Sequence, residues 1–254
     1  MGKQKVIVIC GPTASGKTKL SIEIAKRING EIVSADSMQI YKDMTIGTAK
    51  PTPEEMQGIK HYLIDFVSPN QRYSVADYNK DALKAIDEII KKGKTPIVVG
   101  GTGLYVNSLI YGIEYSDIEV DLEYREKLEE TAKLEGIEKL YEMAKEIDPE
   151  AIKNISKNDQ KRICRILEIY HATGKNKTEQ EKESRKNGPK YQYLLYGITM
   201  DREKLYDRIN KRVDIMINDG LIEEVQNVVK KYDEFPTAMQ GLGYKEVVEY
   251  LNGI

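Results

Sequence analysis

The sequence predicts an α/β fold, a doubly wound and mainly parallel sheet with a helical insertion domain. Short apolar runs alternate with longer segments of helical period, as in repeated strand, helix, strand units. A glycine-rich turn follows the first apolar run and leads into a helical segment. One long stretch interrupts the alternation because it has helical periods and no convincing strand. We therefore expect a core in residues 1–112 and 191–254 and a helical insertion in residues 113–190.

Five apolar runs are expected to form the sheet, and several are apolar on both faces, as buried parallel strands require. These runs are 5–10, 31–35, 61–67, 95–100 and 193–200. Ser74 and Asp77 have the spacing of a capping box, which predicts that a helix begins there. Its apolar residues recur at helical spacing; they are Val75, Tyr78, Ala82, Ile86, Ile89 and Ile90.

Composition favours a globular protein without a metal cluster. Lysine and arginine number 39 and aspartate and glutamate 41 in 254 residues, so any preference for nucleic acid must come from local clustering. Two cysteines and two histidines, none in ligand spacing, do not suggest a disulfide framework or a zinc site. A phosphate-type loop beginning at residue 11 leaves no room for a signal peptide, and no apolar run is long enough for a membrane span. We expect a cytoplasmic monomer that does not bind membranes.

The expected insertion has a split charge. Residues 114–150 hold 14 acidic and five basic side chains, a net charge of −9, whereas residues 153–190 hold 11 basic and five acidic ones, a net charge of +6. In the helix predicted around residues 160–173, we expect four side chains to face inward and Gly174 to end the helix. The inward residues are Ile163, Ile166, Leu167 and Tyr170. Lys161, Arg162 and Arg165 lie away from that stripe, which fits either a solvated face or a nucleic-acid contact.

The segment "GPTASGKT", residues 11–18, fits the phosphate-loop pattern G-x-x-x-x-G-K-[ST] and lies between a strand and a helix. Backbone amides from about Ala14 to Thr18 would point into one concavity at the positive end of the helix. Lys17 adds a full charge, and Thr18 offers a hydroxyl to Mg²⁺. This P-loop fits a diphosphate or triphosphate.

The residues around the loop differ from those of a typical P-loop ATPase. Such an ATPase has a metal-binding aspartate after a later hydrophobic strand, but here 95–100 runs into Gly100-Gly101-Thr102-Gly103. The nearest carboxylate at a strand end is Asp36. Because ligands of doubly wound sheets bind at the carboxyl ends of the strands, Asp36, Thr102 and the loop should converge. Asp36 would then be a base or a metal partner; the alternative is a local cap on the following turn.

A basic pair is expected on the helix after the last strand. Arg208 and Arg212 are four residues apart, so they share one side of that helix. Over the crevice they would neutralise developing phosphate charge, and otherwise they would pair with Asp207 or Asp214. The inward face of this helix is expected to comprise Leu205, Ile209, Val213 and Met216.

Two enzyme classes fit these features, a small-molecule kinase and a transferase from which diphosphate departs. The basic insertion is more than a small acceptor needs, which favours the transferase slightly. Seven segments of the sequence also resemble the tRNA dimethylallyltransferases, which are also called tRNA isopentenyltransferases. They are "GPTASGKT", "SADSMQIYKDMTIGTAKPT", "HYLIDFVSP", "YSVADY", "VVGGTGLYVNSLIYG", "NDQKRICRILEIY" and "GLGYKE".

The resemblance implies transfer of a dimethylallyl group from dimethylallyl diphosphate to N6 of the adenosine 3′-adjacent to the anticodon, in tRNAs reading codons that start with U. It implies that Asp36 accepts the amine proton, that Thr102 lies near the bridging oxygen, and that Lys17, Arg208 and Arg212 act on the diphosphate. The implied diphosphate-binding residues are Gly11, Pro12, Thr13, Ala14, Ser15, Gly16, Lys17 and Thr18, with Thr18 also a ligand of Mg²⁺. The implied tRNA-binding residues are Asp36, Ser37, Met38, Gln39, Lys161, Arg162, Ile163, Cys164, Arg165, Gln240, Gly241, Leu242, Gly243, Tyr244 and Lys245. The partner is expected to be the anticodon stem-loop of tRNA.

One departure and two alternatives accompany this resemblance. Family members continue for some tens of residues past "GYKE" through a segment that contains tryptophan, whereas this sequence has none and ends at Ile254. The basic insertion argues against an adenylate dimethylallyltransferase of the cytokinin-forming type. The glycine turn at 100–103 argues against a small-molecule P-loop kinase.

Overall fold

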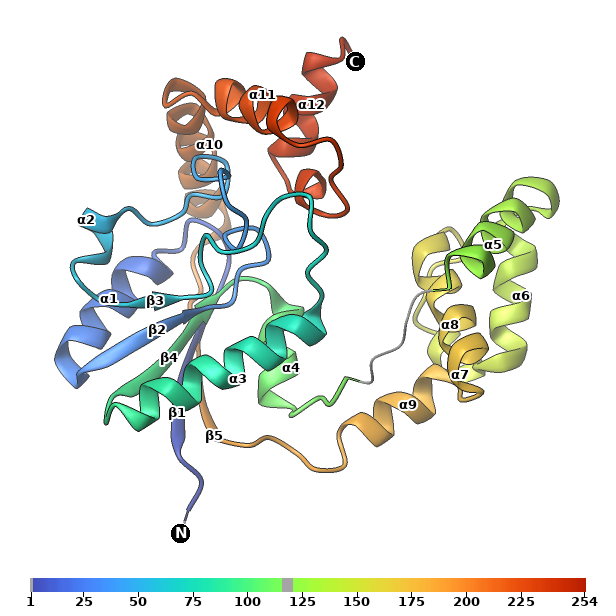
Figure 1. Cartoon of the computed structure of the whole chain (residues 1–254), viewed down its shortest axis with the longest axis horizontal. Coiled ribbons are helices and arrows are strands. Elements are labelled where there is room, and N and C mark those ends of the chain that lie inside the picture. Colours follow the sequence, from blue (N-terminus) through green and yellow to red (C-terminus); the bar gives the residue numbers. More distant parts are fainter. Residues whose placement is uncertain (1, 116–120) are drawn as a thin grey trace. The chain divides into compact units, whose positions relative to one another are not determined.

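The computed structural model describes residues 2–115 and 121–254, and residues 116–120 of the expected insertion lie outside this description. The chain divides into two compact units (Figure 1). One unit comprises Met1–Ile110 and Pro189–Ile254, and the other comprises Tyr111–Gly188. Both boundaries lie two residues before those expected from the sequence.

The first unit is built on a five-stranded parallel sheet, and the predicted fold class is confirmed. The strands are β1 (Lys5–Cys10), β2 (Gly30–Ser34), β3 (His61–Tyr62), β4 (Thr95–Gly100) and β5 (Gln192–Gly197), in the order β3-β2-β4-β1-β5. Cys10, the last residue of β1, pairs with Gly100 of β4 and with Gly197 of β5. The loops that follow these strands therefore leave the same edge of the sheet side by side.

The third strand is much shorter than the predicted run 61–67. Leu63 and Asp65 both have φ of 59°, in the left-handed region, so the extended backbone ends after Tyr62. The rest of the run contributes only an isolated bridge between Tyr41 and Val67.

Helices cover both faces of the sheet (Figure 1). Helix α1 (Lys17–Ile28) packs through Ile22 and Ala25 on a cluster that includes Ile9, Ile32 and Ile97. Helices α3 (Val75–Lys91) and α4 (Gly103–Ile110) pack on the opposite face, against alternate residues of the same strands such as Val8. The capping box of Ser74 and Asp77 at the start of α3 is confirmed.

Further helices surround the carboxyl ends of the strands. They are α2 (Pro53–Met56), α10 (Arg202–Asn218), α11 (Leu221–Lys231), the 3₁₀ turn η1 (Ala238–Gln240) and α12 (Tyr244–Leu251). A core of their own joins α11 and α12 to the segment after β2; it contains Ile40, Tyr41, Met44, Leu221, Val225, Val228, Ala238 and Tyr244.

The predicted inward face of α10 is wrong in part. No side chain of this helix is fully buried, and Val213 is 44% exposed. Only Met216 of the four residues packs against the core of α11 and α12. In Figure 1, α10 stands beyond the strand ends and not on a face of the sheet, so it has no wide apolar surface to cover.

The second unit is helical in its described residues. It contains α5 (Leu122–Glu135), α6 (Ile137–Ile147), α7 (Pro149–Ile152), α8 (Gln160–Thr173) and α9 (Lys177–Ser184). Ile163, Ile166 and Leu167 of α8 are buried in its core, and Gly174 ends α8 with φ of 69°, as predicted. Tyr170 is 44% exposed, so its predicted inward position is wrong; the buried residue of that turn is Ile169. No helix in residues 2–115 or 121–254 is long and apolar enough to cross a membrane.

Candidate active site

The P-loop connects β1 to α1 and presents the amino end of the helix without a side-chain cap. Gly16 precedes α1 with φ of 91°, a left-handed conformation that suits glycine. The first-turn amides therefore remain available for an anion. The Ser15 hydroxyl is buried and lacks a partner among the described residues. A Cβ on Gly11 would lie 2.8 Å from the Ile198 carbonyl oxygen, so the turn after β1 requires glycine.

Cationic side chains surround the loop. The Lys17 ammonium donates hydrogen bonds to the carbonyl oxygens of Gly11 (2.8 Å) and Pro12 (2.7 Å). Burial lowers the pKa of Lys17, Arg212 lowers it further, and the negative charge of Asp36 opposes both effects. Burial also lowers the pKa of Arg212, against the opposing charges of Asp36 and Glu55. These incompletely hydrated cations would be stabilised by a bound anion.

Asp36 follows β2 and holds one carboxylate oxygen in a backbone turn. Its Oδ1 accepts hydrogen bonds from the amides of Met38 (2.9 Å) and Gln39 (3.3 Å). Asp36 thus caps the turn that follows it, which was the alternative role expected from the sequence. It also lines the cavity beside the P-loop. No described residue donates a hydrogen bond to Oδ2, which leaves that oxygen available to a ligand.

Thr102 joins the ends of β4 and β2. Its amide donates to the carbonyl oxygen of Ala35 at 3.1 Å, and its hydroxyl accepts the Ser37 amide at 3.0 Å. The same hydroxyl donates to Oγ of Ser37 at 3.2 Å. This close approach depends on Gly100, because a Cβ there would collide with the backbone of Ala35.

A cavity of about 600 Å³ brings most of the predicted catalytic residues together. Lys17, Thr18, Asp36, Arg208 and Arg212 line it. Thr102 does not line this cavity, and neither do Gly11 and Pro12 of the loop. Neither Arg208 nor Arg212 has an ion pair with a described residue; the pair formed on α10 is Lys211 with Asp207, at 2.8 Å.

Several residues of this cavity were missed by sequence reasoning. They are Lys19, Ile22, Thr48, Ala49, Glu55, Gln57, Lys211 and Ile215. Lys211 could have been found, because it lies between the two predicted arginines in "RINKR". Thr48 and Ala49 enter through a loop without helix or strand, whose path carries no periodic signal.

The donor set fits a metal ion that is bound mainly through a substrate. Among the described residues, no group of three or more histidine, cysteine, aspartate or glutamate side chains could hold a metal. Thr18 lines the cavity together with Asp36. Mg²⁺ commonly binds a protein through few groups and completes its shell with phosphate oxygens and water, so one hydroxyl beside the phosphate loop is compatible with it.

The predicted tRNA segment of α8 presents only part of its residues. Lys161, Arg162 and Arg165 are exposed, whereas Ile163 is fully buried and offers no side chain to a partner. Cys164 is largely buried but still lines the groove beside the basic groups. The basic groups line a groove of about 1090 Å³ within the helical unit. Its floor includes Glu168, which is 8% exposed and pairs with Arg125 at 2.7 Å and with Arg165 at 3.4 Å.

The predicted segment Gln240–Lys245 lies in the first unit, next to the turn of Asp36. Gln240, Leu242 and Lys245 are exposed, whereas Gly241 and Tyr244 are buried. A Cβ on Gly241 would collide with the side chain of Met38. The segment that follows Asp36 and this distant segment therefore share one packed surface.

The fold and the site define a P-loop protein with a carboxylate and cationic side chains opposite the loop. A family model described as IPP transferase matches residues 39–254. A tRNA dimethylallyltransferase of Acetivibrio thermocellus is 61% identical over 249 residues, which cover 98% of this chain and 80% of that protein. The chain belongs to the tRNA dimethylallyltransferase (IPP transferase) family, and the predicted resemblance is confirmed.

Solved structures agree with this assignment. The full-length tRNA isopentenylpyrophosphate transferase of Bacillus halodurans superposes with a TM-score of 0.69 at 43% identity, over 99% of this chain and 78% of that one. A eukaryotic dimethylallyltransferase, described as acting on tRNA, superposes with a TM-score of 0.80 at 31% identity, over 98% of this chain and 64% of that one.

Proposed function

We propose that this chain transfers a dimethylallyl group from dimethylallyl diphosphate to N6 of the adenosine 3′-adjacent to the anticodon. The acceptors would be tRNAs that read codons starting with U, and diphosphate would be released. The observation that carries the proposal is that one cavity holds both a phosphate loop and the Asp36 carboxylate. Family membership and relatives named for transfer to tRNA support the same reaction.

Asp36 is the proposed base. As the N6 nitrogen forms a bond to the allylic carbon, the carbon–oxygen bond to the diphosphate breaks and its electron pair leaves with the diphosphate. The nitrogen then has to lose a proton, for which Oδ2 of Asp36 is the acceptor. Two backbone amides hold Oδ1, so the orientation of the accepting oxygen is set before substrate binds.

The P-loop and α10 are proposed to stabilise the departing diphosphate. Loop amides, the Lys17 ammonium and the guanidinium groups of Arg208 and Arg212 offer positive charge to a group that gains negative charge as it leaves. Thr102 is proposed to act near the bridging oxygen. In the described structure its hydroxyl contacts Ser37, so this role requires the hydroxyl to turn toward the substrate or to share its contacts.

Mg²⁺ is the proposed cofactor, and Thr18 would contribute to its binding. When bound, the ion would neutralise part of the diphosphate charge. The remaining oxygens of its shell would come from the substrate and from water, since the cavity offers no cluster of carboxylates among the described residues.

Both units are proposed to contact tRNA. The target base has to leave its stack to reach the cavity. Lys161, Arg162 and Arg165 would hold backbone phosphates, while Asp36–Gln39 and Gln240–Lys245 would contact the anticodon loop.

A competition assay tests the proposal. Purified protein with Mg²⁺ and labelled dimethylallyl diphosphate is offered an anticodon stem-loop RNA and AMP together, and ATP hydrolysis is measured separately. We expect label in the RNA at the adenosine 3′ of the anticodon and no ATP hydrolysis. Label in AMP alone would support the cytokinin-type alternative, and formation of ADP from ATP together with a phosphorylated small acceptor would support a kinase.

A further inference from the structure

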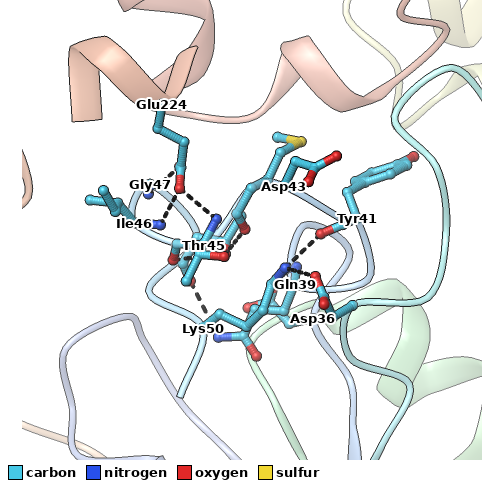
Figure 2. Close-up of polar contacts among 12 residues, drawn as sticks. Asp36, Gln39, Tyr41, Asp43, Thr45, Ile46, Gly47, Lys50 and Glu224 are labelled. Carbon is cyan, nitrogen blue, oxygen red and sulfur yellow. Dashed lines mark hydrogen bonds and ion pairs between the residues drawn. The ribbon is translucent and has the colours of Figure 1, made fainter. Parts of the chain in front are cut away.

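A carboxylate from α11 binds three successive backbone amides of the loop that follows the Asp36 turn (Figure 2). Oε2 of Glu224 accepts hydrogen bonds from the amides of Thr45 (2.8 Å) and Ile46 (2.7 Å), and Oε1 accepts one from Gly47 (3.1 Å). The Tyr244 hydroxyl also donates to Oε1. Successive amides that point to one side form an anion-binding concavity, and hydrogen bonds to a carboxylate are among the stronger ones.

The loop held by Glu224 is a closed unit. The Lys50 amide donates to the Thr45 carbonyl at 3.0 Å, and the Thr48 hydroxyl donates to the Met44 carbonyl at 2.6 Å. The loop contains neither helix nor strand, so its position depends on contacts with the rest of the unit. These include Glu224 and the hydrogen bonds from the Lys50 ammonium to the Tyr41 carbonyl and to Asp65. A displacement at residues 45–47 is therefore passed on to Thr48 and Ala49.

Gln39 links this loop to the proposed base. Its side-chain Nε2 donates to the carbonyl oxygens of Thr48 (3.2 Å) and Ala49 (3.1 Å). Its backbone amide donates to Oδ1 of Asp36 at 3.3 Å. Gln39 thus binds the loop through its side chain and the Asp36 carboxylate through its backbone amide.

Packing supports the same connection. A Cβ on Gly47 would lie 2.6 Å from the ring of Tyr244, so the loop is seated directly on that ring. Tyr244 is 1% exposed and belongs to the core that also contains Met44 and Leu221. The loop, α11 and α12 therefore form one packed body beside the active site.

We propose that Glu224 is a positioning residue of the transfer reaction, which orients the Asp36 carboxylate through residues 45–49 and Gln39. The inference rests on the proposed role of Asp36 as the base. Glu224 does not line the cavity, so it acts without touching a substrate. Loss of its contacts would let the base move relative to the amine, and small displacements of a reacting group reduce turnover strongly.

The test compares Glu224→Gln with Glu223→Gln. The glutamine amide keeps one acceptor oxygen, so at least one of the three amides loses its partner. We expect kcat to fall by about 10- to 100-fold, while the Kd for inorganic diphosphate stays within twofold, both measured well below the melting temperature. Glu223 is exposed on the same helix, and its variant should retain wild-type kcat. A Glu224→Gln enzyme that is less heat-stable but has wild-type kcat would overturn the proposal.

A second experiment measures the coupling between Glu224 and Asp36 without a dimethylallyl-transfer assay. The amides of Met38 and Gln39 donate to Asp36, so their hydrogen exchange reports the orientation of that carboxylate. Glu224→Gln should accelerate their exchange, and Glu223→Gln should not. Unchanged exchange in Glu224→Gln would overturn the coupling. Accelerated exchange in Glu224→Gln, combined with a wild-type protein that transfers nothing to RNA, would refute the proposed function alone.

A third variant places Gln39 in the same chain of contacts. Gln39→Leu removes the side chain that grips the loop, so it should lower kcat as Glu224→Gln does. In the Gln39→Leu background, Glu224→Gln should have less than about twofold further effect, because the link is already broken. Fully multiplicative effects would show that Glu224 does not act through Gln39. If Glu224→Gln does not fold, Gln39→Leu still tests the link on which the proposal depends: unchanged exchange at Met38 in that variant would overturn it.

Discussion

The hydroxyl of Thr102 accepts the Ser37 amide at 3.0 Å, directly beside Asp36. This contact joins the turn after β4 to the turn after β2, and both turns leave the same edge of the sheet. The position of the proposed base therefore depends on a residue that lies 65 positions further along the chain than Ser37.

Thr102→Val should reduce kcat by about 10- to 100-fold. Valine keeps the shape but leaves the Ser37 amide without its acceptor, which costs about 1–3 kcal/mol. Thr102→Ser keeps the hydroxyl and should remain within a few fold of wild type. Steady-state transfer to a stem-loop RNA at saturating donor measures both. Wild-type kcat in Thr102→Val together with a loss in Thr102→Ser would show that the methyl group, and not the hydroxyl, matters.

Asp36→Asn should separate chemistry from binding. The asparagine oxygen can still accept the amides of Met38 and Gln39, but the side chain cannot take a proton. We expect kcat to fall by about 10²- to 10⁴-fold, while the Kd for the stem-loop RNA changes less than about threefold. Single-turnover transfer and filter binding measure the two quantities. Exposed Asp233 provides a matched Asp→Asn control, and near-normal turnover in Asp36→Asn would remove Asp36 as the base.

Arg212→Gln should weaken binding of the diphosphate group. Arg212 lies partly buried in the cavity with Asp36, and burial lowers its pKa. A hydrogen bond to a charged group contributes about 1.5–3 kcal/mol, which is about 10- to 100-fold in Kd. Lys204 is exposed on the same helix and does not line the cavity, so Lys204→Gln should cost less than about threefold. Titration calorimetry with inorganic diphosphate and Mg²⁺ checks this, and equal effects would argue against a particular role of Arg212.

The helical unit should contribute a salt-dependent part of RNA affinity. Replacing Lys161 and Arg162 by glutamine removes two exposed charges without placing a carboxylate beside the buried Glu168. We expect log K against log salt to become less steep by about 0.7–0.9 per lost phosphate contact. Lys133→Gln with Lys139→Gln removes the same charge from exposed positions on α5 and α6. If both double variants give the same slope of log K against log salt, the basic face of α8 is exposed to solvent and does not contact RNA phosphates.

Much of the fold could be predicted because its signals are local. The loop motif, the capping box of Ser74 and the stop at Gly174 each depend on a few neighbouring residues, and the structure has them. The strand at 61–67 was predicted too long, because apolar residues do not reveal that Leu63 and Asp65 have left-handed backbones. Apolar spacing in α10 likewise predicts an inward face, but the helix covers no sheet face.

The site could be predicted only where side chains carry the chemistry. Asp36, Lys17 and Arg212 are recognisable by residue type and converge as expected. Glu224 is different, because its partners are backbone amides 177 to 179 residues away. Every residue except proline provides such an amide, so no residue type marks the partners of Glu224. The segment "LIEEVQ" is therefore typical of any amphipathic helix. Only the folded chain distinguishes Glu224 from Glu223.

Asp148 should make the helical unit sensitive to acid. The residue is 1% exposed; Oδ1 accepts the Ala151 amide (2.9 Å) and the Thr178 hydroxyl (2.8 Å), and Oδ2 accepts the Thr178 amide (2.7 Å). Burial alone would raise the pKa of Asp148, but these hydrogen bonds outweigh it and hold the pKa below its ordinary value. The carboxylate therefore stabilises the unit fully above the unfolded-state pKa of about 3.9, and the stabilisation is lost as the pH falls through the lower folded-state pKa.

Asp148→Asn should accordingly lower the free energy of unfolding of the helical unit by about 2–4 kcal/mol at pH 7, because the amide NH₂ cannot accept the Thr178 hydrogen. The difference from wild type should shrink as the pH falls below about 3.9. Hydrogen exchange of core amides in α6 and α8 of the full chain measures it. Glu150→Gln removes an exposed carboxylate from the same short helix and should change the free energy by less than about 0.5 kcal/mol. A loss in Asp148→Asn that stays constant from pH 7 down to acid would show that shape, and not the charge of Asp148, stabilises the junction of α7 and α9.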